Sequence, residues 1–148
     1  MSTEPVDFLS EQEQQASADF LENGYIIVDA EAPELLDRLR DKIAALAAAY
    51  LKLDTPGDAG KLLNTIHERV SPTELNALRL AVINGVAGES WVRSAYFNIA
   101  KQALSTIVGN ELVMQRRINL SVQMPNDVSS LLPVHADVWS GDSPFEVV

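Results

Sequence analysis

The chain has 148 residues, of which 47% are hydrophobic and 22% charged, so its length and composition fit one globular domain spanning residues 1–148. Its formal net charge is −10, and thirteen of the 21 acidic side chains but only four of the eleven basic ones lie in the first 60 residues, an imbalance that repels nucleic acid. Cysteine is absent, so we expect no disulfide. The longest apolar run is far shorter than the roughly 18 residues of a membrane span, so we expect no membrane contact. The N-terminus lacks the basic region followed by an apolar one that marks a secretory signal, so we expect a cytoplasmic location.

The first 60 residues carry clear helix signals. Ser10 and Glu13 form a capping-box pattern that opens a helix, and Asn23-Gly24 ends it with a glycine able to adopt a left-handed conformation. Residues 25–28, Tyr-Ile-Ile-Val, then predict a short strand. Pro33 predicts the first turn of a second helix, whose apolar side chains recur at Leu35, Leu36, Leu39, Ile43, Leu46, Ala47 and Tyr50. Residues 55–60 have the composition of a loop.

Two more helices are predicted before residue 110. Ser71-Pro72-Thr73-Glu74 combines a capping box with a proline at the first helical position, and its helix extends to about Asn84-Gly85. A further helix is predicted from about Glu89 to near Gly109. Residues 1–110 are therefore expected to be mainly helical.

The pattern changes after Gly109. Apolar and polar side chains alternate from Ile118 to Gln123, which predicts a half-buried strand within residues 112–123. Residues 124–127 have turn chemistry, a second strand is predicted over residues 131–139, and a third begins at Phe145 and is cut off at Val148. An unfinished apolar strand leaves an open edge, so we expect the chain to be part of a longer protein or a truncated form of one.

His135 and Asp137 form the pattern with the most chemical meaning. On a strand the first and third side chains of three point to the same face, so an imidazole nitrogen and a carboxylate oxygen can bind one divalent metal ion. With a second histidine they would make the facial triad of non-haem Fe(II) oxygenases. No histidine follows Asp137, and on spacing alone a strand histidine bonded to a nearby polar group is the alternative.

The segment around this pair resembles phytanoyl-CoA dioxygenase-like Fe(II)/2-oxoglutarate oxygenases, in particular a bacterial subgroup linked to carbohydrate-biosynthesis clusters. The matching residues are LLPV (131–134) leading into His135-Ala136-Asp137, then WSGD (139–142) and PFEVV (144–148). The opening FLENGYIIV (20–28) resembles the helix, glycine and apolar strand that begin that superfamily. The resemblance implies an α+β fold in which N-terminal helices pack on the first strands of an incomplete double-stranded β-helix, or jelly roll, formed by residues 111–148.

The resemblance also implies a function and a site. The function is hydroxylation of a small molecule, with a sugar-derived metabolite as one candidate substrate, and the cofactor and cosubstrate are Fe(II) and 2-oxoglutarate. His135 and Asp137 are the implied metal ligands. The candidates for binding cosubstrate or substrate are Asn119, Ser121 and Gln123, which share one strand face, and Trp139. The alternative for the three polar residues is that they simply face solvent. The alternative for Trp139 is packing in the core. Arg116 and Arg117 are weaker candidates for binding the carboxylate of 2-oxoglutarate, because the arginine that does so in the family follows the distal histidine.

Two rival interpretations remain open. The first is a cupin-type enzyme that binds a divalent metal without using 2-oxoglutarate. The second is a truncated, non-catalytic domain that forms a homo-oligomer through its exposed strand edge. His67, the only other histidine, is expected to be a surface or capping residue.

Overall fold

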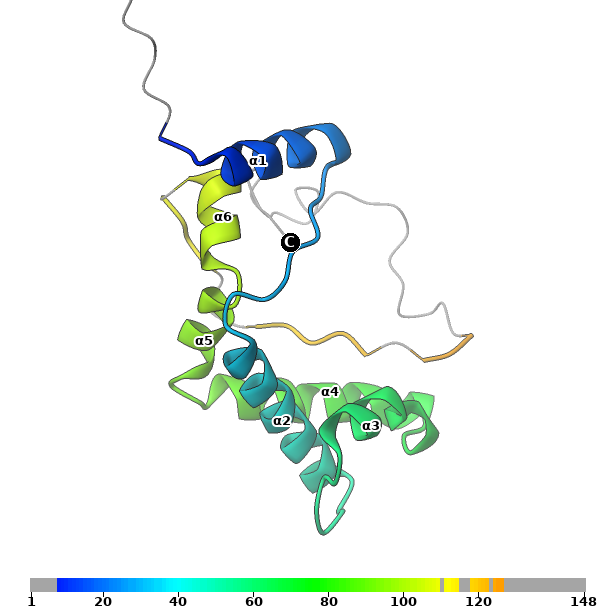
Figure 1. Ribbon diagram of the computed structural model, residues 1–148. Helices are drawn as coiled ribbons and strands as arrows, with labels where there is room; N and C mark the ends of the chain where they lie inside the picture. The colour runs from blue at the N-terminus through cyan, green and yellow to red at the C-terminus, as the bar shows by residue number, and fades with distance from the viewer. Residues whose placement is uncertain (1–7, 110, 115–117, 123, 127–148) are drawn as a thin grey trace, which may run out of the picture.

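The computed structural model of the protein describes residues 8–109, 111–114, 118–122 and 124–126 (Figure 1). Within these ranges the chain forms six α-helices and one short 3-10 helix. Their bounds are α1 (Glu11–Asn23), α2 (Pro33–Tyr50), α3 (Ala59–Asn64), η1 (Ile66–Glu68), α4 (Pro72–Ala87), α5 (Val92–Asn98) and α6 (Lys101–Val108).

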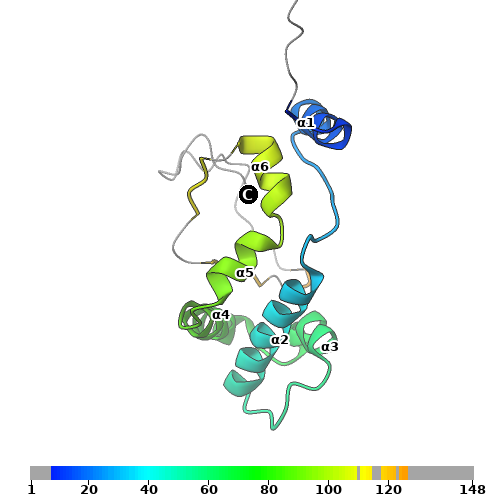
Figure 2. The ribbon, with the colours of Figure 1, turned by 60° about the vertical axis from the view of Figure 1, so that its left-hand side comes forward.

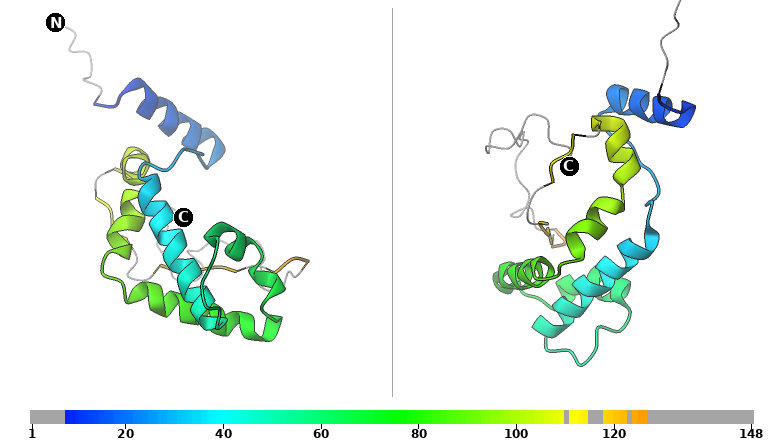
Figure 3. Two further views of the ribbon diagram at one scale, coloured as in Figure 1. Left: turned by 60° about the horizontal axis from the view of Figure 1, so that its bottom comes forward. Right: turned by 90° about the vertical axis from the view of Figure 1, so that its left-hand side faces the viewer.

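The helices fall into two groups. α2 packs on α3, α4 and α5, while α1 packs on α6. In Figures 1 and 2, α5 leads from the first group to α6, and α1 lies at the far end of the molecule from α3 and α4. The two views of Figure 3 show the same separation.

A hydrophobic core holds the first group together. Its buried members come from α2, η1, the turn before α4, α4 and α5: Leu39, Ala47, Ile66, Val70, Leu78, Val82, Val86 and Val92. A smaller cluster of Ala44, Ala48 and Leu62 joins α2 to α3, because alanines allow the two backbones to approach closely. Each large aliphatic side chain buried here contributes about 1.5–3 kcal/mol relative to exposure.

Gly85 shows how closely α2 and α4 pack. A Cβ placed on Gly85 would lie 2.5 and 2.8 Å from the two Cδ atoms of Leu46. Glycine in a helix interior costs about 1 kcal/mol relative to alanine, and here it makes room for a side chain of the neighbouring helix. The residue expected to end the helix therefore lies inside α4, which continues to Ala87.

The starts of α1, α2 and α4 agree with the sequence, although the two capping boxes differ. At α1 the box is complete: Ser10 Oγ accepts from Glu13 N–H at 3.3 Å, and Ser10 N–H donates to Glu13 Oε2 at 2.8 Å. At α4 the hydroxyl of Ser71 instead donates to Glu74 Oε2 at 2.7 Å and caps no backbone N–H. Proline at the first turn is confirmed for both α2 and α4.

The expected α+β fold with a jelly-roll core is wrong for the described residues, which contain helices but no strand, sheet or barrel. Residues 25–28 and 118–122 form no regular secondary structure, and within the described ranges no backbone hydrogen bond joins either segment to a neighbouring one. A strand requires such a partner, so an apolar or alternating pattern alone does not produce one.

The helix predicted from Glu89 to Gly109 is also wrong, because two helices, α5 and α6, share that stretch. Ala100 leaves the helical conformation, with φ −140° and ψ 26°. Glu31 satisfies the groups freed by the break: its N–H donates to Ile99 O, and its carboxylate accepts from Gln102 N–H and Ala103 N–H, all at 2.9 Å. α3 begins at Ala59, within the loop predicted over residues 55–60, and neither α3 nor η1 was predicted.

Candidate functional site

Asn119 and Ser121 lie on an extended segment that crosses the helical core. Ile118, Leu120 and Val122 pack against the main hydrophobic cluster, while Asn119 and Ser121 are exposed. The predicted alternation of buried and exposed side chains is thus confirmed, even though the segment is not a strand. Within the part of the chain that the structure describes, neither polar side chain forms a hydrogen bond.

The other predicted site residues lie outside the described ranges. These are His135, Asp137, Gln123 and Trp139, together with Arg116 and Arg117. The proposed metal ligands therefore remain a prediction from the sequence. Among the described residues, no group of three or more His, Cys, Asp or Glu side chains is arranged to hold a metal ion.

His67 lies in η1 with its side chain 32% exposed. The nearest carboxylate oxygen is Glu68 Oε1, at 4.0 Å from Nε2. A single carboxylate at this distance makes no metal site, so the position agrees with the surface role expected for this histidine.

A polar cluster that the sequence did not reveal joins α2 to the turn between α4 and α5. Lys42 Nζ lies 2.6 Å from Glu89 Oε1, and Trp91 Nε1 donates to Glu89 Oε2 at 3.0 Å. The guanidinium carbon of Arg38 lies 3.9 Å from the centroid of the Trp91 ring, a cation–π contact. The hydrogen bond from Lys42, followed by that from Trp91, lowers the pKa of Glu89. The only sequence signal for this cluster was the spacing of Arg38 and Lys42, which places both side chains on one face of α2.

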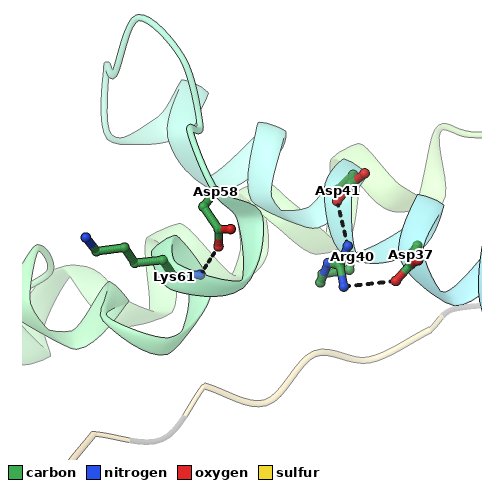
Figure 4. A network of polar contacts seen from close by, with 5 residues as sticks. All are labelled: Asp37, Arg40, Asp41, Asp58 and Lys61. Carbon is green, nitrogen blue, oxygen red and sulfur yellow. Dashed lines mark hydrogen bonds and ion pairs between the residues drawn. The ribbon is translucent and has the colours of Figure 1, made fainter.

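Two concave regions mark the described surface. The first has a volume of about 300 Å³ and lies between the loop after α2 and α3; Asp58, Lys61 and Arg69 line it. Asp58 caps α3, because its Oδ1 accepts a hydrogen bond from Lys61 N–H at 2.6 Å (Figure 4). The same figure shows Arg40 of α2 paired with Asp37 and Asp41. The second, of about 410 Å³, lies between α1 and residues 25–28. Neither encloses a set of groups suited to catalysis.

Comparisons with known proteins identify no relative. No family model matches the chain, and neither a curated protein nor a solved structure matches it. Among the described helices, none has the length and apolar character needed to cross a bilayer.

Proposed function

We propose that the protein is an Fe(II)- and 2-oxoglutarate-dependent oxygenase that hydroxylates a small molecule, with His135 and Asp137 as two of its metal ligands. The observation that carries the proposal is the His-x-Asp spacing inside a segment that resembles this class at residues 131–148. Imidazole nitrogen and carboxylate oxygen are donors that non-haem Fe(II) takes in these enzymes. When bound, the metal and its cosubstrate supply the oxidation of an unactivated C–H bond, which side chains alone do not perform.

The described residues support a role for the segment that precedes the pair. Its apolar face is fixed on the helical core through Ile118, Leu120 and Val122. Its exposed face offers the amide of Asn119 and the hydroxyl of Ser121 as hydrogen-bonding groups for a polar small molecule. We include Gln123 and Trp139 in the same binding region.

An Fe(II) titration followed by NMR tests the metal site, because the chain contains only two histidines. Paramagnetic broadening should affect the imidazole signals of His135 first and should be lost in Asp137→Ala, which keeps the His135 imidazole. His67→Ala is the matched control and should leave the broadening unchanged. Broadening of the His67 signals first, or undiminished broadening of the His135 signals in Asp137→Ala, would contradict the proposed ligands.

Activity gives the second test. Two protein ligands leave most of the coordination sphere to water, so the 148-residue chain should bind Fe(II) weakly and should not convert 2-oxoglutarate to succinate. Micromolar or tighter binding with succinate formation would mean that another residue completes the site. In a protein that joins this chain to the distal histidine and arginine of the family pattern, His135→Ala or Asp137→Ala should abolish succinate formation.

The remaining parts of the proposal follow from composition and resemblance. A sugar-derived metabolite is the substrate class that the resembling subgroup suggests. The net charge of −10 disfavours nucleic acid, and the absence of cysteine suits the cytoplasm.

A second candidate function is self-association, which the exposed apolar residues beside α1 favour. Leu21 is 85% and Ile27 89% exposed, and the nearby residues Tyr25 and Val28 are exposed as well. Several exposed apolar side chains within one short stretch of the chain favour an interaction site. Light scattering should give a mass above the 16.2 kDa of one chain, reduced to one chain by Ile27→Glu but not by Leu80→Glu on α4. A monomeric wild-type chain would eliminate this candidate.

A further inference from the structure

α1 and α6 form a unit that lies apart from the hydrophobic core, called here the α1–α6 arm. Ser17 Oγ on α1 donates to Thr106 O on α6 at 3.4 Å, and neither helix has a fully buried residue. Among the described residues, no side chain of the arm belongs to either hydrophobic cluster. The arm is therefore held by its connections rather than by burial in the core.

Glu31 bonds to both sides of the short junction, Ile99-Ala100, that joins α5 of the core to α6 of the arm. Its N–H donates to Ile99 O at the end of α5, and Ile99 packs against the main cluster. Its two carboxylate oxygens accept the N–H groups of Gln102 and Ala103, each at 2.9 Å, in the first turn of α6. These N–H groups have no partner inside their helix, and a negative charge at this end of a helix is favourable. One residue thus binds the last turn of the core and the first turn of the arm.

The linker between α1 and Glu31 restrains the arm weakly. Residues 25–30 lead from α1 to Glu31, and within the described part of the chain they form no hydrogen bond. Tyr25 and Ile27 are 63% and 89% exposed, so little burial fixes this linker. Its conformation can change with small loss of contact energy.

We propose that Glu31 is a latch and that the α1–α6 arm opens as a unit when the latch is released, while α2–α5 stay folded. The reason is that, among the described residues, no side chain of the arm joins either hydrophobic cluster, so the Glu31 bonds, together with the short Ile99-Ala100 junction between α5 and α6, orient the arm relative to the core. Local opening of such units is common where buried apolar contacts are few. The device is independent of the proposed oxygenase activity.

Amide hydrogen exchange on the whole chain is the first test. Glu31→Ala should accelerate exchange in both α6 and α1 about tenfold, the order of effect that loss of a helix cap produces, and should leave α2 and α4 unchanged. Glu31→Gln keeps one acceptor oxygen and should have a smaller effect. Glu22→Ala, which removes an exposed acid from α1 itself, is the matched control and should change nothing. Equal acceleration in α2 and α4 would overturn the proposal, since the chain would then open as one unit.

A distance measurement separates a latch from a local cap. The chain has no cysteine, so spin labels can be placed at two introduced cysteines, Ala18→Cys on α1 and Ala77→Cys on α4, both exposed positions. Glu31→Ala should broaden the distance distribution between these labels. A pair within the core, Ala45→Cys and Ala77→Cys, should keep its distribution. An unchanged distribution between α1 and α4 would show that Glu31 only caps α6, and would overturn the proposal.

Discussion

Replacing Gly85 by alanine tests whether contact with α2 outweighs helix propensity. In an open helix the change would stabilise the protein by about 1 kcal/mol. Here the new Cβ would lie 2.5, 2.8 and 3.2 Å from Cδ2, Cδ1 and Cγ of Leu46, so the side chain of Leu46 must move. Overpacking of this kind costs about 1–3 kcal/mol, and we therefore expect Gly85→Ala to lower the free energy of unfolding by about 1 kcal/mol net.

A double-mutant cycle with Leu46→Ala isolates this contact. Leu46→Ala alone should cost about 2 kcal/mol, because it removes a partly buried side chain that packs on the core. In the Leu46→Ala variant the clash is gone, so adding Gly85→Ala should stabilise the protein by about 1 kcal/mol. The effect of Gly85→Ala on the free energy of unfolding therefore changes sign between the two backgrounds. Gly88→Ala is the control, because its Cβ would meet Gly85 O at 3.4 Å and Asn84 O at 3.7 Å, which are ordinary contact distances, and no side chain of α2.

Urea unfolding followed by the helical circular dichroism signal measures all five proteins, that is, the wild type, the three single variants and the double variant. The reasoning is refuted if Gly85→Ala stabilises the wild-type chain, or if it has the same effect with and without the Leu46 side chain.

Three further predictions concern single residues. Lys52 follows α2 with φ 56°, a conformation that costs a non-glycine residue about 1 kcal/mol, so Lys52→Gly should raise the urea midpoint slightly; a lower midpoint would contradict this. Since the pKa of Glu89 is lowered in the folded state, its ion pair with α2 stabilises the protein above the ordinary value of 4.5 and is lost as the pH falls through the lowered value. The stability difference between wild type and Glu89→Gln should accordingly be constant near neutral pH and shrink in acid, whereas a pH-independent difference would argue against the pair. Ser10→Ala should destabilise α1 by about 1 kcal/mol, seen as faster amide exchange, while Ser71→Ala should cost less at α4; equal effects would mean that the distinction between the two caps is wrong.

For the candidate site, the sequence predicted which residue types could act together but not how they are arranged in space. His135 and Asp137 were found because metal coordination needs particular residue types at a particular spacing, and both remain predictions. The exposed position of Asn119 and Ser121 followed from the alternation of apolar and polar residues. When the apolar side chains of such a segment face the core, the polar ones between them face solvent. The cluster of Glu89, Trp91 and Lys42 could not be predicted, since it depends on the packing of α2 beside the turn after α4.

The sequence by itself determined the features that depend on neighbouring residues. The capping box of Ser10 and Glu13, the first-turn prolines and the apolar spacing of α2 act within a few residues of each other, so their helices begin where they were predicted. Only the tertiary structure decided the rest. Glu31 divides α5 from α6 from about 70 residues away, and Leu46 explains a glycine inside α4. Residues 25–28 have strand composition, but a strand also needs a partner that hydrogen-bonds to its backbone, and no local pattern specifies that partner.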